Sequence, residues 1–547
     1  MRIVIVGAVA GGASAAARAR RLDENAEIIL FERGEAPSFA NCGLPYFVGG
    51  VIEEREALLV APKQRLEQRY RLDVRTQTEV TAIDRAKKVV RVRNLETSDE
   101  YEQAYDKLIL SPGAAPLRPP IPGADLPNVF TLRDLRDADR LHEIVQGAGH
   151  AVVIGAGFIG LEMAENLVHR GVKTTVVELA DQILPPWDAE MVAPVAGYME
   201  QQGVELKLAD AAEAIEAVGE TMRVQLRSGQ QIGADLVVMS VGVRPENALA
   251  VAAGLDVGLR GGIQVDQHMR TSDADIYAVG DAVEVRHFVD GRPVQIPLGG
   301  PANRQGRIAA DCIFGRDSSF RGTQGTAVVG VFDMVVAMTG HSEKVLQAAG
   351  HSYLKAYVHP KDHAGYYPGA ESLSIKLLFE PEGGKVLGAQ VVGRKGVDKR
   401  VDVLAVAIQA GMTVYDLEEL ELAYAPQFGS AKDPVNMVGF VAAGMLRGDH
   451  PMEYAENLPT ENSEDGPFVL DVRSLAELEA GHLPGAVNIS IDELRGRLDE
   501  VPRDRLIVAY CQVGMRGYLA TRLLMQRGFN VKNLAGGYTT YRAMELS

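Results

Sequence analysis

The chain has 547 residues, which is too many for one hydrophobic core and indicates three or four domains. Its formal net charge of -17 disfavours nucleic acid as a partner, and no uninterrupted apolar run approaches the ~18 residues of a membrane-spanning helix. We therefore expect a cytoplasmic protein without membrane partners. Three scattered cysteines, Cys42, Cys312 and Cys511, are too few for a disulfide framework, and no metal site is predicted.

The first segment, RIVIVGAVAGGASAAARARRLDENAEIILFERG, predicts a strand over 2–6, a glycine-rich turn, a helix, and a strand over 27–31 that ends at Glu32. The glycines of the turn are Gly7, Gly11 and Gly12. Val9 stands where the second glycine of G-x-G-x-x-G would be. The segment is typical of a dinucleotide-binding βαβ unit in which Glu32 binds an adenosine ribose, and an ordinary glycine-rich turn is the alternative.

Cys42 lies in SFANCGLPYFVGG, and no second cysteine is near it in the sequence. A redox pair of the form Cys-x4-Cys is excluded, because the second position is Phe47. The thiol could instead pair with a substrate thiol or cycle through a sulfenic acid. The segment predicts the start of a helix, where the aligned backbone dipoles would hold Cys42 as a thiolate. The alternative is a small buried apolar residue.

A second βαβ unit begins at HAVVIGAGFIGLEMAENLVHRGVKTTVVELA and has the complete glycine pattern. Its glycines are Gly155, Gly157 and Gly160, and its second strand ends at Glu178. Two such units predict two dinucleotides, a flavin and a nicotinamide, with hydride transfer between them. A carboxylate at Glu178 would favour NADH over NADPH by repelling a 2′-phosphate, and a solvated strand-end acid is the alternative.

Two later segments resemble the two-dinucleotide-domain flavoprotein oxidoreductases. TSDADIYAVGDAVE resembles the second flavin motif, in which Asp281 would hold the ribityl chain, and SVGVRPE resembles the return from the NAD domain. The resemblance implies a discontinuous FAD-binding domain over 1–112 and 241–325, with an NAD(P)H-binding domain over 113–240. Further cofactor contacts are expected at Arg33, Gly242, Gly280 and Ala302.

SFANCGLPY, AGGASAAARARRLDE, PLGGPANRQGR and YAPQFGSAKDPVN together resemble the single-cysteine coenzyme A-disulfide reductases, over roughly residues 1–450. In that family CoA forms a mixed disulfide with the cysteine. The resemblance implies CoA contacts at Ser14, Arg18, Arg21, Ser38, Asn41 and Lys432.

Arg18 and Arg21 are i, i+3 neighbours and, with Arg20, would form a basic spot for the phosphates of CoA. A solvated arginine face is the alternative. The resemblance also implies a homodimer in which the dimerisation domain, over 326–448, brings two tyrosines to the partner's cysteine. The sequence offers Tyr367 and Tyr424 for these roles, with Tyr366 as a competitor for the first, and an ordinary core or interface tyrosine is the alternative for each.

A polar segment over 449–464 predicts a linker, and residues 465–547 resemble a rhodanese, or sulfurtransferase, domain. A buried strand would deliver Cys511 to a short loop, and Arg516 is a candidate catalytic residue in that loop. Successive backbone N–H groups there would form an anion cradle that stabilises a thiolate or persulfide. Asp471 and Arg473 are expected to hold the scaffold, while Cys312 follows helical spacing and is expected to pack in a core.

These observations predict an α/β protein with two Rossmann-like dinucleotide-binding domains, an α+β dimerisation domain and a C-terminal α/β rhodanese domain. The expected activity is reduction of CoA persulfide, polysulfide or CoA disulfide by NADH or NADPH through FAD and a Cys42–CoA mixed disulfide. Two alternatives stay open: an NADH oxidase or peroxidase that uses a Cys42 sulfenic acid, and a sulfur-trafficking protein with a redox-sensing flavoprotein half.

Overall fold

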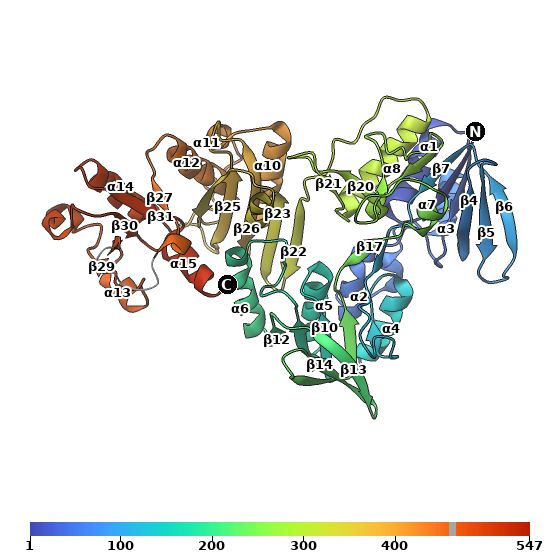
Figure 1. The fold of residues 1–547 in the computed structure, drawn as a ribbon, viewed down its shortest axis with the longest axis horizontal. Coiled ribbons are helices and arrows are strands. Elements are labelled where there is room, and N and C mark those ends of the chain that lie inside the picture. The colour runs from blue at the N-terminus through green and yellow to red at the C-terminus, as the bar shows by residue number, and fades with distance from the viewer. Residues whose placement is uncertain (459–465) are drawn as a thin grey trace. The chain divides into compact units, whose positions relative to one another are not determined.

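The computed structural model describes residues 1–458 and 466–547 and divides into two compact units (Figure 1). The first unit comprises residues 1–179 and 203–325, and the second comprises residues 180–202 and 326–547. The chain therefore passes from one unit to the other after residues 179, 202 and 325. Among the described residues, no helix is both long and apolar enough to cross a membrane.

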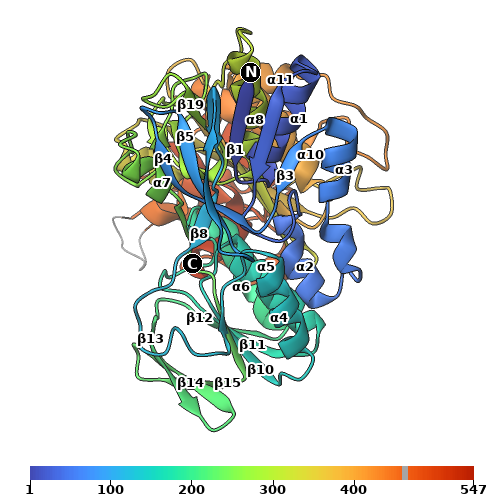
Figure 2. The same cartoon turned by 90° about the vertical axis from the view of Figure 1, so that its right-hand side faces the viewer.

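The first unit contains a parallel sheet with the strand order β19-β7-β1-β2-β3. Its strands are β1 (Arg2–Val6), β2 (Glu27–Phe31), β3 (Asp73–Arg75), β7 (Lys107–Leu110) and β19 (Ile276–Ala278). β1 and β2 have the bounds that the sequence predicted. Helices α1 (Ala10–Leu22) and α8 (Gly299–Ile313) lie side by side (Figure 2). They approach so closely that a Cβ at Gly306 would lie only 2.2 Å from the Gly11 carbonyl oxygen.

A second parallel sheet of the first unit has the order β12-β11-β10-β16-β9. Its strands are β9 (Val129–Phe130), β10 (His150–Ile154), β11 (Lys173–Val177), β12 (Val204–Lys207) and β16 (Leu236–Met239). Helix α5 (Phe158–His169) connects β10 to β11, which confirms the second predicted βαβ unit. An antiparallel sheet of β13 (Ala212–Val218), β14 (Thr221–Leu226) and β15 (Gln231–Ala234) shares its apolar core.

The other elements of the first unit are shorter. β8 (Ala114–Pro116) pairs with β17 (Val243–Pro245) where the chain leaves the first sheet and where it returns. The remaining elements are α2 (Leu44–Gly49), α3 (Lys63–Tyr70), β4 (Thr78–Asp84), β5 (Val89–Asn94), β6 (Glu100–Ala104), α4 (Leu135–Val145), α7 (Ala248–Ala252), β18 (Ile263–Gln264), β20 (Val283–Arg286) and β21 (Pro293–Val294).

The second unit is built on an antiparallel sheet with the order β22-β23-β26-β25-β24. Its strands are β22 (Ala327–Val331), β23 (Met334–Gly340), β24 (Leu354–Val358), β25 (Leu373–Phe379) and β26 (Val386–Gly393). β26 is buried along its whole length, because helices cover it. Helices α10 (Val397–Ala410) and α6 (Ala189–Gln201) contact this sheet, as Figure 1 shows, and so does α12 (Pro434–Leu446). α11 (Val414–Glu419) packs on α12, and α9 (Glu343–Ala348) lies between β23 and β24 in the sequence.

The C-terminal part of the second unit is a parallel sheet with the order β27-β31-β30-β28-β29. Its elements are β27 (Met452–Glu453), β28 (Phe468–Asp471), α13 (Leu475–Glu479), β29 (Val487–Asn488), β30 (Ile507–Tyr510), α14 (Met515–Met525), β31 (Val531–Leu534) and α15 (Gly537–Glu545). Part of the segment predicted as a linker is a strand, β27, because Met452 and Glu453 pair with β31. Residues 459–464 of that predicted linker lie outside the described part of the chain.

Candidate active site

The two glycine-rich turns have the same geometry. Gly7 and Gly155 both have a positive φ, +93° and +105°, which glycine adopts without steric cost. A Cβ at Gly12 would lie 1.8 Å from the Gly7 carbonyl oxygen, and a Cβ at Gly160 would lie 1.9 Å from the Gly155 carbonyl oxygen. Each βαβ unit therefore needs glycine at its first and last turn positions, for conformation and for close packing of the helix on the strand.

The middle glycine of the pattern has a different function, which explains why the first turn tolerates Val9. Val9 has a φ of -88° and Gly157 a φ of -79°, so neither backbone requires glycine. A Cβ at Gly157 would meet nothing within 4 Å. This position therefore matters only for the space that it leaves in front of the helix, where a pyrophosphate is bound in such folds.

The strand-end acids also occupy equivalent positions. Glu32 accepts a hydrogen bond from the Ala8 backbone N–H at 2.9 Å, and Glu178 accepts one from the Ala156 backbone N–H at 2.7 Å. Both carboxylates are thus held beside their glycine-rich turns, where the ribose of a dinucleotide is bound. The residues of both turns fit adenine dinucleotides.

The predicted ribityl-binding segment lies at the end of β19. The Gly280 backbone N–H donates to Gln305 at 2.8 Å, and burial raises the pKa of Asp281. A hydrogen-bond donor from a bound group would stabilise the Asp281 carboxylate, so this position fits a flavin hydroxyl. Ala302 is buried on α8, near the first turn.

Two other predicted cofactor residues have different surroundings. The Arg33 guanidinium forms an ion pair with Glu246 at 2.9 Å, so its charge is already partly neutralised within the first unit. Gly242 has a φ of +106°, which explains glycine at the return to the first sheet.

Cys42 is exposed and lies in a single 3₁₀ turn over Asn41–Gly43, directly before α2. The surrounding protein raises the pKa of Cys42, and the carboxylates of Glu162 and Asp281 raise it further. These carboxylates oppose the thiolate that the sequence predicted at the start of a helix. The helix that follows has only six residues, and two nearby carboxylates oppose a negative charge on sulfur.

Contacts with α4 and α5 fix the position of the helix that follows Cys42. A Cβ at Gly49 would lie 1.9 Å from the Asn166 side-chain oxygen, and the Arg170 Nε donates to the Val48 carbonyl oxygen at 3.2 Å. The ring of Phe47 stacks on His142 with 4.6 Å between centroids. The helices α4 and α5 beside the second sheet therefore position the cysteine segment.

Glu162 is a site residue that the sequence reasoning missed. Its carboxylate lies 3.5 Å from the Tyr46 hydroxyl, and burial, with the charge of Glu165, raises the pKa of Glu162 to about 7. Perturbed carboxyl groups of this kind are concentrated at functional sites. The available signal was an acid two residues after Gly160 on the helix that binds the dinucleotide.

We predict that Glu162→Gln makes Cys42 more reactive above pH 7, because it removes a negative charge that raises the pKa of the thiol. A shift of half a unit would accelerate alkylation of Cys42 by iodoacetamide roughly threefold at pH 8. At pH 5.5 Glu162 is protonated, so the variant should match the wild type. The rates are measured by mass spectrometry of the Cys42 peptide, with exposed Glu143→Gln on α4 as control. Equal rates at pH 8 would contradict the assignment.

The predicted CoA contacts in the first unit are not equally available. Arg18 forms an ion pair with Asp311 at 2.6 Å, and Arg20 is buried with its guanidinium bonded to backbone carbonyls. Arg21 is exposed, so the basic spot has less free charge than the sequence suggested. Ser14 hydrogen-bonds Asn303.

The remaining first-unit candidates flank the cysteine. Ser38 has a φ of +50°, and its backbone N–H donates to Ala8 at 2.8 Å. Asn41 is exposed beside Cys42. Ser38 thereby ties the cysteine segment to the first glycine-rich turn.

In the second unit, the Tyr366 and Tyr424 hydroxyls lie 2.8 Å apart, and both side chains are exposed. Tyr367 instead packs its ring edge-on against His363, with centroids 5.8 Å apart. Lys432 is exposed. The structure therefore joins Tyr424 to Tyr366, the competitor, rather than to Tyr367.

Cys511 is 1% exposed at the end of β30 and begins a tight loop. Gly514 has a φ of +96°, and α14 starts immediately after it. The Cys511 carbonyl oxygen accepts from the Tyr538 backbone N–H at 2.9 Å, which fixes the loop. Because the first N–H groups of a helix have no partner within that helix, this loop fits an anion at the cysteine sulfur.

Two arginines lie beside this loop. Arg473 and Asp471 form a fully buried ion pair at 2.8 Å, and the Tyr510 hydroxyl donates to Asp471 at 2.6 Å, as expected for a scaffold pair. Arg516, in the first turn of α14, pairs with Glu477, and the charges of Glu477 and Cys511 raise the pKa of Arg516. Cys312, by contrast, packs against the core of the first unit.

Three protein families match the chain. Residues 1–306 match the pyridine nucleotide-disulphide oxidoreductase family, residues 326–433 match its dimerisation domain, and residues 452–544 match the rhodanese-like domain. The coenzyme A disulfide reductase of Staphylococcus aureus (strain JH9) is 35% identical over 444 residues, which are 81% of this chain and 99% of that protein.

Two solved structures are similar over nearly the whole length. Reduced Bacillus anthracis CoADR-RHD shares 49% identity, covers 99% of this chain and 98% of its own, and has a TM-score of 0.97. The NAD-dependent persulfide reductase from A. fulgidus shares 39% identity over 99% and 100% of the two chains, with a TM-score of 0.93. The matching family models, the fold and the paired glycine-rich turns agree: the chain belongs to the pyridine nucleotide-disulphide oxidoreductase family and carries a C-terminal rhodanese-like domain.

Proposed function

We propose that the protein is a flavoenzyme that reduces CoA persulfides and CoA disulfide with NADH or NADPH. The observation that carries this proposal is one exposed cysteine, Cys42, near the predicted flavin residue Asp281, in a chain whose other reactive-loop cysteine is Cys511 of the rhodanese-like domain. We assign FAD to residues 1–112 and 241–325 and the nicotinamide to 113–240. The relatives that act on CoA disulfide and on persulfides support this function.

The proposed reaction at Cys42 needs only NADH or NADPH as reductant. The Cys42 thiolate attacks the CoA-bound sulfur of CoA–S–SH, a Cys42–S–S–CoA bond forms, and the outer sulfur leaves as hydrosulfide. FAD, whose predicted contacts include Glu32 and Asp281, would supply the two electrons that cleave this mixed disulfide into two thiolates, and NADH or NADPH would be the source of these electrons. With CoA disulfide, the leaving group is CoA thiolate instead. The exposure of Cys42 admits such a substrate.

The chain's own groups would bind and protonate the departing thiolate. We assign Arg21, Ser38 and Asn41 to CoA binding, because they lie at the protein surface or beside Cys42. The hydrogen-bonded pair of Tyr366 and Tyr424 would donate a proton to the leaving thiolate of the partner subunit's site. Their 2.8 Å contact supports Tyr366 over Tyr367 for this function.

Mass spectrometry of the purified protein tests the proposed function. After incubation with CoA disulfide without nicotinamide, the Cys42 peptide should carry one CoA by a reducible disulfide bond. NADH should remove the adduct in the holoenzyme. A Cys42 that forms a sulfenic acid with peroxide, but no CoA adduct, would instead support an oxidase or peroxidase.

A subunit-mixing experiment tests the tyrosine assignment. We expect that a Cys42→Ser subunit and a Tyr366→Phe, Tyr424→Phe subunit, each inactive as a homodimer, form a heterodimer with one working site and roughly half of the wild-type activity. The two subunits are co-expressed with different tags and purified in sequence. The matched control replaces the tyrosine pair with Tyr367→Phe, which should remain active alone. A purified heterodimer without activity would mean that the tyrosines do not serve the partner's cysteine.

A further inference from the structure

Arg516, at the start of α14 beside the Cys511 loop, has its own carboxylate partner. The Arg516 guanidinium contacts Glu477 with both terminal nitrogens, one of them at 2.8 Å. Glu477 is fixed in turn, because it forms a capping box with Ser474 at the start of α13. The ion pair holds the pKa of Glu477 at about 2, so the carboxylate stays charged at neutral pH. Glu477 therefore offsets part of the positive charge that Arg516 brings to the loop.

The second arginine beside the loop is neutralised as well. Arg473 is 1% exposed and contacts both carboxylate oxygens of Asp471, while its Nη1 donates to the Gln512 side-chain oxygen in the loop at 3.1 Å. It supplies a rigid support for the loop and no unbalanced charge.

The surface around the loop also carries exposed apolar side chains. Val513 in the loop is 40% exposed, and Met515 and Leu519 on α14 are 53% and 50% exposed. Met515 and Leu519 are i, i+4 neighbours, so they share one face of the helix. A strongly hydrated anion gains little from such a surface, whereas an alkyl chain loses unfavourable contact with water there.

Sulfur donors differ in the charge that they bring to Cys511. A Cys511 thiolate that attacks the outer sulfur of R–S–SH forms Cys511–S–SH and releases RS⁻, with one negative charge throughout. The same attack on the outer sulfur of thiosulfate forms a Cys511 persulfide and releases sulfite, and it brings a dianion against the thiolate. The second reaction therefore needs an unbalanced cation at the loop far more than the first.

We propose that Glu477, through its ion pair with Arg516, makes the Cys511 loop selective for hydropersulfides, R–S–SH, whose R group is uncharged near the sulfur, over thiosulfate. This inference rests on the proposed sulfane-sulfur chemistry of Cys511. Glu477 is a positioning and charge-setting residue, and it does not touch the transferred sulfur. The pantetheine end of a CoA persulfide has the favoured chemistry, since its phosphates lie at the other end of the molecule.

The wild-type full-length protein gives the first test. Thiocyanate formation from cyanide is measured with thiosulfate and with N-acetylcysteamine persulfide as donors, and the rate of Cys511→Ser is subtracted. We expect kcat/KM to be at least about tenfold higher for the persulfide. Equal values, or a preference for thiosulfate, overturn the proposal. Transfer from neither donor overturns the proposed function of Cys511 together with it, so the two failures are distinguishable.

The variant Glu477→Gln gives the second test, and glutamine can still complete the capping box with Ser474. We expect kcat/KM for thiosulfate to rise about tenfold while the value for the persulfide changes less than about twofold. Glu479→Gln, an exposed acid on the same helix, is the matched control and should change neither value. A parallel change for both donors indicates a merely structural function and overturns the proposal.

A chemical probe separates charge from donor chemistry. Iodoacetate and iodoacetamide react at the same thiol and differ in charge. The rate with iodoacetate divided by the rate with iodoacetamide at Cys511 should be several-fold higher in Glu477→Gln than in the wild type. High salt should reduce this difference between the variant and the wild type. An unchanged ratio overturns the proposal even if the donor preference changes.

Discussion

Cys42→Ser should abolish reduction of CoA persulfide and CoA disulfide while the protein still binds FAD and accepts electrons from NADH. The loss of kcat should exceed about a thousandfold, because serine cannot form the mixed disulfide through which the sulfur bond is cleaved. The flavin should stay bound, since its predicted contacts are the Gly7 turn, Glu32 and Asp281. Anaerobic bleaching of the flavin by NADH and product thiol release measure the two halves of the reaction separately.

Cys312→Ser is the matched control for this experiment. Cys312 packs against the core of the first unit, and its thiol donates to the Ser318 carbonyl oxygen, so serine should preserve both activity and flavin content. Persulfide reduction that survives Cys42→Ser would contradict the proposed function. Loss of flavin in Cys42→Ser would show instead that the cysteine segment is needed to build the cofactor site.

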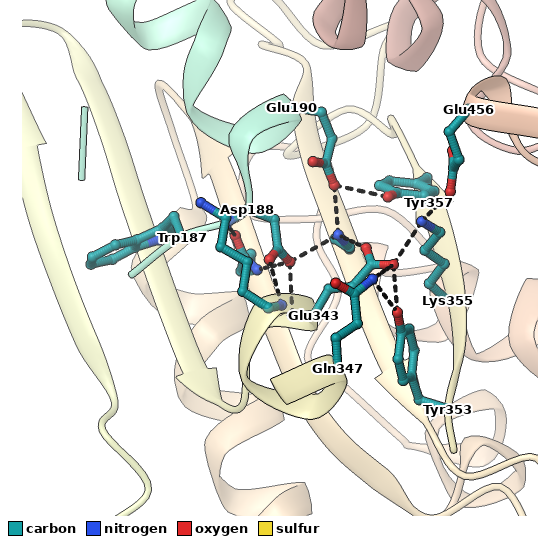
Figure 3. Close-up of polar contacts among 12 residues, drawn as sticks. Trp187, Asp188, Glu190, Glu343, Gln347, Tyr353, Lys355, Tyr357 and Glu456 are labelled. Carbon is teal, nitrogen blue, oxygen red and sulfur yellow. Dashed lines mark hydrogen bonds and ion pairs between the residues drawn. The ribbon is translucent and has the colours of Figure 1, made fainter. Parts of the chain in front are cut away.

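Lys376→Met should give the largest loss of stability in the second unit. Lys376 on β25 is completely buried, and its ammonium contacts Asp188 at 2.8 Å, Glu190 at 2.6 Å and Glu343 at 2.5 Å. Figure 3 shows these three carboxylates close together. Methionine would leave three clustered carboxylates without their central cation. Breaking a buried ion network in this way costs about 3–5 kcal/mol.

The thermal midpoint of the second unit should fall by roughly 10 °C in Lys376→Met. Exposed Lys385→Met is the control and should change it little. Adding Glu343→Gln to the Lys376→Met variant should restore part of the loss, because it removes one of the repelling charges. Calorimetry of the variants and the wild type measures the midpoint. A fall no larger than that of the control would mean that the network adds no stability.

The same network predicts a dependence on pH. The cations of Lys376 and Lys355 hold the pKa of Glu343 at about 2, against an ordinary value of 4.5. A carboxyl group with a lowered pKa in the folded state stabilises the fold above its unfolded pKa, and this contribution is lost as the pH falls. The second unit should therefore lose stability between pH 4.5 and pH 2, and less so in Glu343→Gln.

The local pattern predicted the dinucleotide turns well, because their geometry depends on a few adjacent residues. Gly7 and Gly155 need a positive φ, and Gly12 and Gly160 need the absence of a Cβ, so the spacing of glycines is itself the physical constraint. Val9 made the first glycine pattern incomplete, but the turn still forms because this position needs no positive φ.

The charge environment of the sites could not be predicted in the same way. Asp311 reaches Arg18 from a helix almost 300 positions later in the sequence, and Glu162 reaches the surroundings of Cys42 from another domain. Similarly, Tyr366 and Tyr367 are adjacent, and only the fold shows which hydroxyl meets Tyr424. Contacts between distant segments decide these properties, and residue spacing does not contain them.

The passage of residues 180–202 into the second unit has a consequence for modularity. Asp188 lies directly before α6, and Glu190 lies in its first turn. A fragment that begins at residue 326 would lack both residues, so buried Lys376 would keep only Glu343 of its three carboxylate partners. The dimerisation sheet and the dinucleotide sheets therefore cannot be separated by a single cut in the sequence, because residues 180–202 of the second unit lie between two segments of the first unit. The rhodanese-like part follows as a single contiguous block, and the S. aureus reductase matches 81% of this chain over 99% of its own length. In this architecture, the rhodanese-like part is contiguous in sequence but packs within the second unit, where His359 contacts Thr540 at 2.8 Å, and the dimerisation sheet depends on residues 180–202 of the reductase part.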